Sequence, residues 1–287
     1  MNDFSKKSVL VTGASSGIGN AIAIYLAKQS YTVLATVRKE ADAESLDKLG
    51  LDNLKPLYPL DLTEPDQIYM IANIIEEQIQ KMELPPLYAI INVAGGGQIA
   101  PIELMNIGKF REELEKRLVG PIFLLQKLLP LLRVMQGRVF WIATPSLLPV
   151  PYVADIHASD FAVNYLARTL NIELCPDGIK NVLIRCGGIN TSSPQRTENY
   201  FSEMFDHWSK EIVNVYKDRL IRLRKDMELF NKRRTEPEKV AILVYKILNK
   251  KNPKTRYQVG YMSNLGSFFE KLPQSWVDFI MKKKECW

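Results

Sequence analysis

The chain of 287 residues has only three cysteines, Cys175, Cys186 and Cys286, and only two histidines. The cysteines lie far apart and none has a CxxC spacing, which argues against a disulfide framework and against a conventional zinc site. No run of about 18 uncharged apolar residues exists, as a transmembrane helix would require. No apolar stretch precedes residue 8, so we expect no secretory signal. These absences predict a protein of a reducing compartment, the cytoplasm, that binds no metal.

The chain also has little net charge, +6, because 32 Asp and Glu nearly balance 38 Lys and Arg. A basic run within residues 217–234 is interrupted by Asp218, Asp226 and Glu228. We interpret it as a solvated helix face. No nucleic-acid-binding module accompanies it, so we expect no nucleic-acid partner.

Short β-branched runs alternate along the chain with longer stretches whose apolar residues have helical spacing. The predicted strands are 8–12, 32–37, 56–60, 87–93, 138–143 and 181–185. The predicted helices are 18–30, 64–81, 106–135, 155–174 and one beginning near residue 236. Strands that alternate with helices in this order predict an α/β fold, a doubly wound (Rossmann-type) parallel sheet covered on both faces. We expect residues 1–287 to form a single domain.

Two segments depart from this alternation. Residues 192–235 form an insertion with an aromatic and apolar stripe over 200–216, which we interpret as a helical lid. Such a stripe serves either core packing or the cover of a cleft for an apolar molecule. Residues 263–287 form an amphipathic C-terminal flap in which Phe and Trp precede a run of lysines. Peripheral contact of this flap with an anionic membrane is one interpretation of that pattern.

The most informative stretch runs from Thr12 to Gly19, where a predicted strand leads through a glycine-rich turn into a helix. Glycine allows a tight turn and the close approach of a pyrophosphate, and the amides that begin the helix bind it. A plain strand-to-helix turn is the alternative. The residues assigned here to cofactor binding are Thr12, Gly13, Ser15, Gly17, Ile18 and Gly19.

The second predicted strand ends beside Arg38. In a doubly wound fold this position meets the adenosine ribose, where a carboxylate favours NAD(H) and a guanidinium favours the 2′-phosphate of NADP(H). Arg38 therefore predicts NADP(H) as the cofactor. The alternative is a solvated surface arginine.

The glycine turn is followed along the chain by three more segments: Asp61-Leu62, Asn92-Val93-Ala94-Gly95 and residues 186–191. Together these four segments resemble the cofactor half of the short-chain dehydrogenase/reductase family. The strand end at Arg38 and the segment 186–191 look most like its estradiol 17β-dehydrogenase and retinol dehydrogenase branch. The resemblance implies NADP(H), flat apolar alcohols or ketones as substrates, and a homodimer or homotetramer. It adds to the cofactor site Asp61, Leu62, Asn92, Ala94, Gly95, Gly187 and Thr191.

The catalytic half of the family pattern, a Ser-Tyr-Lys-Asn set with tyrosine four residues before lysine, is degenerate. Alignment places Thr144 at the serine, Ile156 at the tyrosine and Asp160 at the lysine, and Arg117 falls at the asparagine. None of the twelve tyrosines has a lysine four residues later. Losing positioned acid catalysis lowers rates about 10²–10⁴-fold.

The residues that remain as catalytic candidates are Thr144, His157, Asp160 and Arg117. His157 and Asp160 are three residues apart, so they can share a helix face and form an acid–base pair; alternatively His157 packs at an oligomer contact. Asp160 is expected to accept hydrogen bonds from the nicotinamide ribose. Arg117 either pairs with Asp160 or is a solvated helix charge.

Three functions fit this sequence. The leading hypothesis is a non-redox enzyme that binds NADP(H) and carries out a cyclisation, isomerisation or elimination on an apolar small molecule. The second is a divergent NADPH-dependent carbonyl reductase or alcohol dehydrogenase with a non-standard proton donor. The third is a non-catalytic subunit of a hetero-oligomer.

Overall fold

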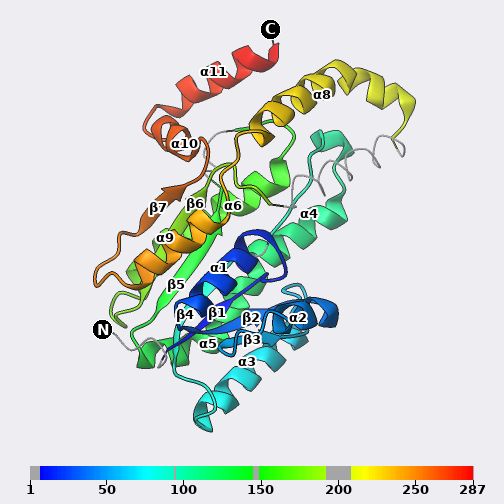
Figure 1. Ribbon diagram of the computed structural model, residues 1–287. Coiled ribbons are helices and arrows are strands. Elements are labelled where there is room, and N and C mark those ends of the chain that lie inside the picture. The colour runs from blue at the N-terminus through cyan, green and yellow to red at the C-terminus, as the bar shows by residue number, and fades with distance from the viewer. Residues whose placement is uncertain (1–6, 94, 145–148, 192–207, 287) are drawn as a thin grey trace.

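The computed structural model describes residues 7–93, 95–144, 149–191 and 208–286. Its centre is a seven-stranded sheet with the order β3-β2-β1-β4-β5-β6-β7, in which every neighbouring pair is parallel (Figure 1). The strands are β1 Ser8–Val11, β2 Thr32–Thr36, β3 Leu54–Leu57, β4 Leu87–Asn92, β5 Arg138–Ala143, β6 Lys180–Cys186 and β7 Arg256–Val259. The predicted doubly wound α/β fold is confirmed.

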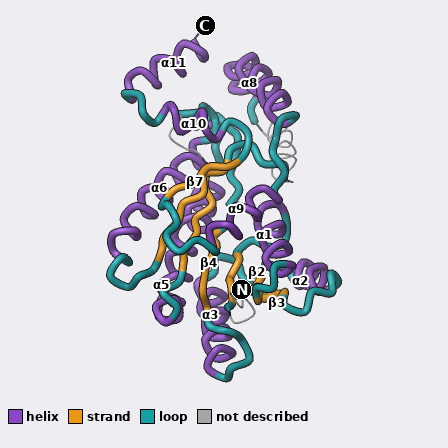
Figure 2. The backbone as a smooth tube through the Cα atoms, turned by 60° about the vertical axis from the view of Figure 1, so that its left-hand side comes forward, coloured by secondary structure: helices purple, strands orange, loops and turns teal. Residues whose placement is uncertain are grey.

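Helices cover both faces of the sheet (Figures 1 and 2). One face packs against α1 Gly17–Lys28, α2 Glu40–Asp47 and α9 Glu238–Leu248, and the other against α3 Pro65–Gln80, α5 Gly120–Val134 and α6 Ala154–Glu173. Successive strand side chains point to opposite faces, so Val9 and Val11 of β1 join one core and Leu10 joins the other. This two-sided burial explains why β4 and β5 are buried at every position.

The strand order fixes where a ligand can bind. The chain winds outward from β1 to β2 and β3, then returns to the other side of β1 with β4. At such a reversal the two crossovers leave in opposite directions, and a crevice opens at the carboxyl ends of the strands. The turn after β1 and the segment after β4 both begin at this edge.

Three details differ from the sequence-based prediction. The third strand spans Leu54–Leu57, whereas the prediction placed it at 56–60. The sequence analysis missed α2 and β7, which are short and weakly patterned. The predicted helix 106–135 is divided into α4 Ile107–Leu114, a π-helical turn η3 Glu115–Val119, and α5.

Three further helices lie beyond the carboxyl ends of the strands (Figure 1): α8 Lys210–Asn231, α10 Ser263–Phe269 and α11 Gln274–Cys286. The first belongs to the predicted lid, of which residues 192–207 lie outside the described residues. The other two form the predicted flap, and they expose Phe268, Trp276 and Phe279. Within the described part of the chain, no helix combines the length and hydropathy needed to span a membrane.

Candidate active site

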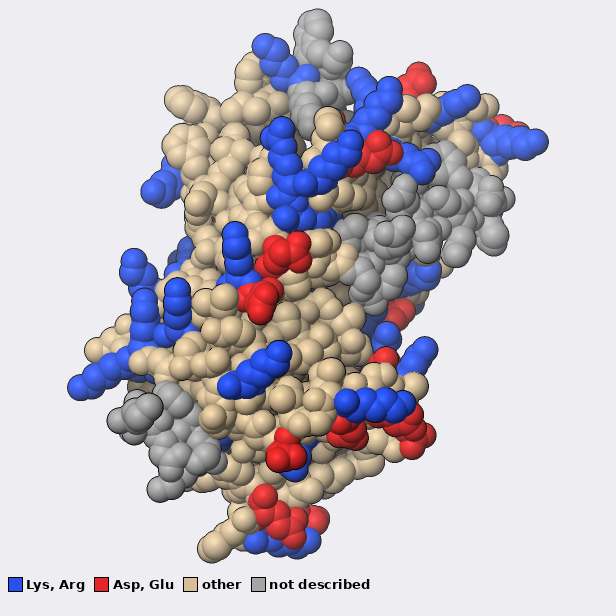
Figure 3. All heavy atoms as spheres, viewed as in Figure 1, with Lys and Arg blue, Asp and Glu red and all other residues tan. Residues whose placement is uncertain are grey.

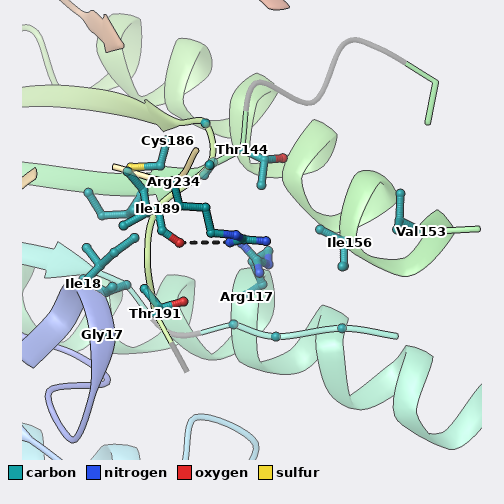
Figure 4. A pocket seen from close by; sticks show the side chains of 18 of the residues that line it. Gly17, Ile18, Arg117, Thr144, Val153, Ile156, Cys186, Ile189, Thr191 and Arg234 are labelled. Atoms are coloured by element: carbon teal, nitrogen blue, oxygen red, sulfur yellow. Dashed lines mark hydrogen bonds between the residues drawn. The ribbon is translucent and has the colours of Figure 1, made fainter. Parts of the chain in front are cut away.

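A cavity of about 1110 Å³ opens at the carboxyl ends of the strands. Its wall combines the turn after β1, the ends of β2 and β4 to β6, the start of α6, and residues of α8, α10 and α11. It includes these predicted cofactor residues: Thr12, Gly13, Ser15, Gly17, Ile18, Gly19, Arg38, Asp61, Leu62, Gly95, Gly187 and Thr191. Figure 4 shows Gly17, Ile18 and Thr191 on one side of this cavity and Ile156 and Val153 on the other.

The turn after β1 has the features that a pyrophosphate requires. Gly13 and Gly17 have positive φ values of 64° and 59°. A Cβ on Gly19 would lie 2.2 Å from the Gly13 carbonyl oxygen, so only glycine fits there. No side chain caps the N-terminus of α1, and its first turn has no acidic residue. The amides and the positive end of the helix dipole therefore remain available for phosphate oxygens.

Thr12 lines the cavity, and its hydroxyl also holds the turn in place through two hydrogen bonds. Its buried hydroxyl donates to the Ile91 carbonyl (3.4 Å) and accepts from the Val93 amide (3.0 Å). These bonds tie the end of β1 to the end of β4, on the two sides of the crevice.

Arg38 and Asp61 stand together on the wall near the ends of β2 and β3. The Asp61 carboxylate accepts hydrogen bonds from the amide (3.0 Å) and hydroxyl (2.9 Å) of Thr63. Its second oxygen lies 3.7 Å from Nη1 of Arg38, whose side chain is 56% exposed. An exposed ion pair at this distance is weak, so the Arg38 guanidinium keeps donors for a 2′-phosphate.

The prediction for Asn92 needs correcting. Its side chain is buried in the sheet, where Nδ2 donates to the Phe140 carbonyl of β5 (3.2 Å), and it does not line the cavity. Oδ1 has no hydrogen-bond partner. Asn92 therefore joins two strands instead of contacting a cofactor. Ala94, predicted beside it, lies outside the described residues.

Beyond the glycine turn lies a buried ionic network centred on Asp160. One carboxylate oxygen accepts a hydrogen bond from Nη1 of Arg117 (2.7 Å), and the other accepts from the amide (2.9 Å) and the hydroxyl of Thr144. Nε of Arg117 donates to Glu113 (2.7 Å). Asp160 and Glu113 are 0% and 1% exposed. The predicted pairing of Arg117 with Asp160 is confirmed.

Two carboxylates thus flank one guanidinium. Burial alone would lower the pKa of Arg117, but the charges of Asp160 and Glu113 outweigh burial and raise that pKa. The π-helical turn η3 carries Arg117, and the guanidinium packs on Gly95, where a Cβ would lie 2.3 Å from Nη2. Arg117 and Thr144 line the cavity, whereas Asp160 is buried behind them and does not.

This geometry overturns two expectations for Asp160. Both of its oxygens are bound by Arg117 and Thr144, so it does not orient His157. It is also screened from the cavity, so it cannot accept hydrogen bonds from a nicotinamide ribose there. His157 does line the cavity, beside Ile156 at the start of α6.

Ile156 and Cys186 line the cavity, whereas Asp155 is buried and does not. Ile156 packs so closely on Gly97 that a Cβ on that glycine would lie 2.1 Å from Cγ1. Burial raises the pKa of the Cys186 thiol to about 12, so it is protonated and weakly acidic. Asp155 is buried and accepts from the amides of Gln98 (2.8 Å) and Ile156 (2.7 Å), and burial raises its pKa.

The family model described as short chain dehydrogenase matches residues 7–200. The chain belongs to the short-chain dehydrogenase/reductase family. Rat "Estradiol 17-beta-dehydrogenase 2" is 31% identical over 288 residues, which cover 96% of this chain and 74% of that protein. Rat "Retinol dehydrogenase 7" is 29% identical, with 94% and 84% covered.

Solved structures of the family show the same fold at lower identity. A short-chain dehydrogenase from Streptomyces avermitilis superposes with a TM-score of 0.75 at 21% identity, covering 100% of this chain and 97% of that one. An alcohol dehydrogenase from Thermococcus sibiricus, complexed with 5-hydroxy-NADP, has a TM-score of 0.70 at 20% identity, covering 88% and 96%.

The helix α8 and the residues after it form one wall of the cavity. The basic side chains of this segment are mostly exposed, as expected for a solvated helix face, and four of its arginines also line the cavity. The positions involved recur every three or four residues, which is the period of one helix face. This spacing is the sequence signal that places arginines and apolar residues on the same helix face. The residues are Arg219, Arg222, Leu223, Asp226, Met227, Phe230, Arg233 and Arg234.

Proposed function

We propose that this family member binds NADP(H) together with an apolar small molecule and transforms that molecule without hydride transfer, in a cyclisation, isomerisation or elimination. The observation that carries this proposal is the network around Asp160. At the positions where the family has its proton-donating and proton-relaying groups, this chain has an isoleucine on the cavity wall and a buried carboxylate that is paired with Arg117 and hydrogen-bonded by Thr144.

Binding of NADP(H) is supported by the residues present. The glycine turn and the uncapped α1 would hold the pyrophosphate, and Arg38 would hold the 2′-phosphate. When bound, NADP(H) supplies a hydride for carbonyl reduction. Reduction also requires a proton for the carbonyl oxygen, and that proton has to come from the protein or from water.

None of the three positions aligned with the family's serine, tyrosine and lysine can supply that proton. Ile156 has no ionisable group. The buried Asp160 carboxylate acts only as an acceptor, for one hydrogen bond from Arg117 and two from Thr144. The Thr144 hydroxyl already donates to Asp160. Reduction by the family's route should therefore be slower by about 10²–10⁴-fold, which is the usual contribution of positioned acid catalysis.

His157 is the acid–base group that we assign to the proposed chemistry. It lines the cavity near an apolar wall that includes Val150, Val153 and Ile156. An imidazole titrates near neutral pH, so it can take a proton from one atom of a substrate and return it to another. Such a transfer suffices for an isomerisation or elimination and leaves the cofactor unchanged.

The test combines binding with turnover. Fluorescence titration should give tighter binding of NADPH than of NADH. Purified protein should not oxidise NADPH with apolar ketones such as estrone or a long-chain methyl ketone. Turnover at ordinary enzymatic rates, about 1–10³ per second, would refute the proposal. If His157→Gln abolished that turnover, a divergent reductase with His157 as donor would replace it.

A further inference from the structure

One wall of the cavity is strongly cationic. Four arginines from α8 and the turn that follows it line the cavity: Arg219, Arg222, Arg233 and Arg234. Among the described residues of this wall, one acid, Asp226, lines the cavity. Figure 3 shows Lys and Arg side chains gathered on the upper part of the molecule, over α8. We call these four residues the arginine wall.

Arg234 is the most enclosed member of the arginine wall. Its Nε donates to Oδ1 of Asn231 (2.8 Å) and its Nη1 donates to the Ile189 carbonyl (2.9 Å). The guanidinium also lies 5.3 Å from the centre of the Phe230 ring. These neutral partners orient the group without cancelling its charge. Burial lowers its pKa, which is what an unneutralised guanidinium in a partly desolvated place experiences.

Two further members of the wall contact neutral groups among the described residues. Arg233 donates to the Tyr261 hydroxyl (3.3 Å), and Arg219 lies over the Tyr216 ring at 5.4 Å. Within the described ranges, no ion pair joins any arginine of the wall to a carboxylate. By contrast, Arg117 on the same cavity is flanked by two carboxylates. The arginine wall therefore presents positive charge that the described residues do not compensate.

Apolar side chains surround this charge. They come from α8, from the segment after β7, and from α10 and α11, and they are Leu223, Met227, Leu229, Phe230, Met262, Leu265 and Met281. A surface of this kind suits a molecule with two parts, since the apolar side chains can bury a hydrocarbon body and guanidinium groups bind carboxylate or phosphate through paired hydrogen bonds.

We propose that the small molecule bound here is amphipathic, with an apolar body and an anionic carboxylate or phosphate head that binds the arginine wall. This inference rests on the proposed function, because it specifies the substrate class for the same cavity. The phosphates of NADP(H) have other donors, at the N-terminus of α1 and at Arg38. In Figure 4 the Arg234 side chain extends away from Gly17 and Ile18, toward Arg117.

The experiment compares three probes with one ten-carbon chain: decyl phosphate, decanoate and 1-decanol. Isothermal titration calorimetry would measure their binding to the protein saturated with NADP⁺, below micelle-forming concentrations. We expect at least one anionic probe to bind more tightly than 1-decanol by tenfold or more, and the tighter of the two identifies the head group. Inorganic phosphate alone should bind far more weakly, because it lacks the apolar body.

Variants of the arginine wall make the test specific. Arg222→Gln and Arg234→Gln should each weaken the anionic probe about tenfold, as expected for one charge-assisted hydrogen bond, and leave 1-decanol unchanged. Arg224→Gln is the matched control, because it lies on the same helix, off the cavity wall, 3.9 Å from Glu228. If Arg234→Gln does not fold, Arg219→Gln takes its place, since that arginine is exposed.

Three outcomes would overturn the inference. In the first, 1-decanol binds as tightly as the anionic probes; in the second, the wall variants bind the anionic probes as tightly as the wild type does. In the third, the wall variants lose as much affinity for NADPH as for the anionic probe. The last outcome would assign the arginine wall to the cofactor. NADPH binding to the wild type is measured in a separate titration, which tests the proposed function alone. Failure to bind NADPH would therefore refute the proposed function without being mistaken for a wrong substrate class.

Discussion

The network around Asp160 makes a quantitative prediction about stability. Arg117 is the cation between two buried carboxylates, those of Glu113 and Asp160. Substituting Arg117→Met keeps most of the side-chain volume but leaves two unpaired charges in a place that water hardly reaches. Removing one partner of a buried ion pair typically lowers the free energy of unfolding by about 3–5 kcal/mol. We expect a value in the upper part of this range, because one substitution leaves two charges without a partner.

Two comparison variants separate charge from volume. Asp160→Asn removes one carboxylate but leaves Arg117 paired with Glu113, so it should cost less, about 1.5–3 kcal/mol for the lost charge-assisted hydrogen bonding. Lys116→Met changes the neighbouring cation of η3, whose partner Glu112 is 47% exposed. A surface pair of this kind contributes only about 0.3–0.5 kcal/mol.

Urea unfolding followed by circular dichroism measures all three differences, and thermal unfolding gives an independent check. For a domain of this size, 1 kcal/mol corresponds to about 2–4 °C in Tm, so Arg117→Met should melt at least about 6 °C below the wild type. The expected order of destabilisation is Arg117→Met, then Asp160→Asn, then Lys116→Met. If Arg117→Met were no more destabilising than Lys116→Met, the network would not be an interdependent buried unit and the reasoning would be wrong.

Three further predictions test the cofactor end and the cavity wall. Arg38→Gln should weaken NADPH about tenfold in fluorescence titration and leave NADH unchanged, whereas Lys39→Gln, off the wall, should alter neither. Gly19→Ala should abolish binding of both nucleotides, because its Cβ would lie 2.2 Å from a backbone oxygen of the turn; retained binding would contradict the assignment. Thiolate forms only as pH rises toward the pKa, about 12 for Cys186, so at pH 8 roughly one molecule in 10⁴ is reactive. Iodoacetamide at that pH should modify the exposed Cys175 and spare Cys186, as mass spectrometry of peptides would show.

The parts of the fold that follow local rules could be predicted from the sequence. Short apolar runs, most of them rich in β-branched residues, predicted six of the seven strands, and the glycines at 13, 17 and 19 marked the phosphate turn. These signals are local, because a backbone with positive φ or a strand covered twice restricts the residues at that position itself. The edge strand β7 was not predicted because it has only four residues, none of them fully buried.

The parts of the site that depend on distant partners could not be predicted. Spacing alone allowed Asp160 to share a helix face with His157, but two donors from other elements, Arg117 and Thr144, claim its carboxylate. Asn92 stood in a motif associated with cofactor binding, yet its amide bonds across to β5. In each case the deciding contact spans more than 15 residues, and only the folded chain defines it.

Two of the departures from the family's catalytic set, Asp160 and Arg117, are physically coupled. A carboxylate at position 160 is buried, so it requires a cation, and Arg117 provides it at 2.7 Å. That cation in turn binds Glu113, also at 2.7 Å. Restoring a lysine at 160 alone would place two cations in contact beside one carboxylate, at a high desolvation cost. Introducing the family's Tyr-Lys pair would therefore require changes at 117, 156 and 160 together, because the carboxylate and the guanidinium of the present network depend on each other.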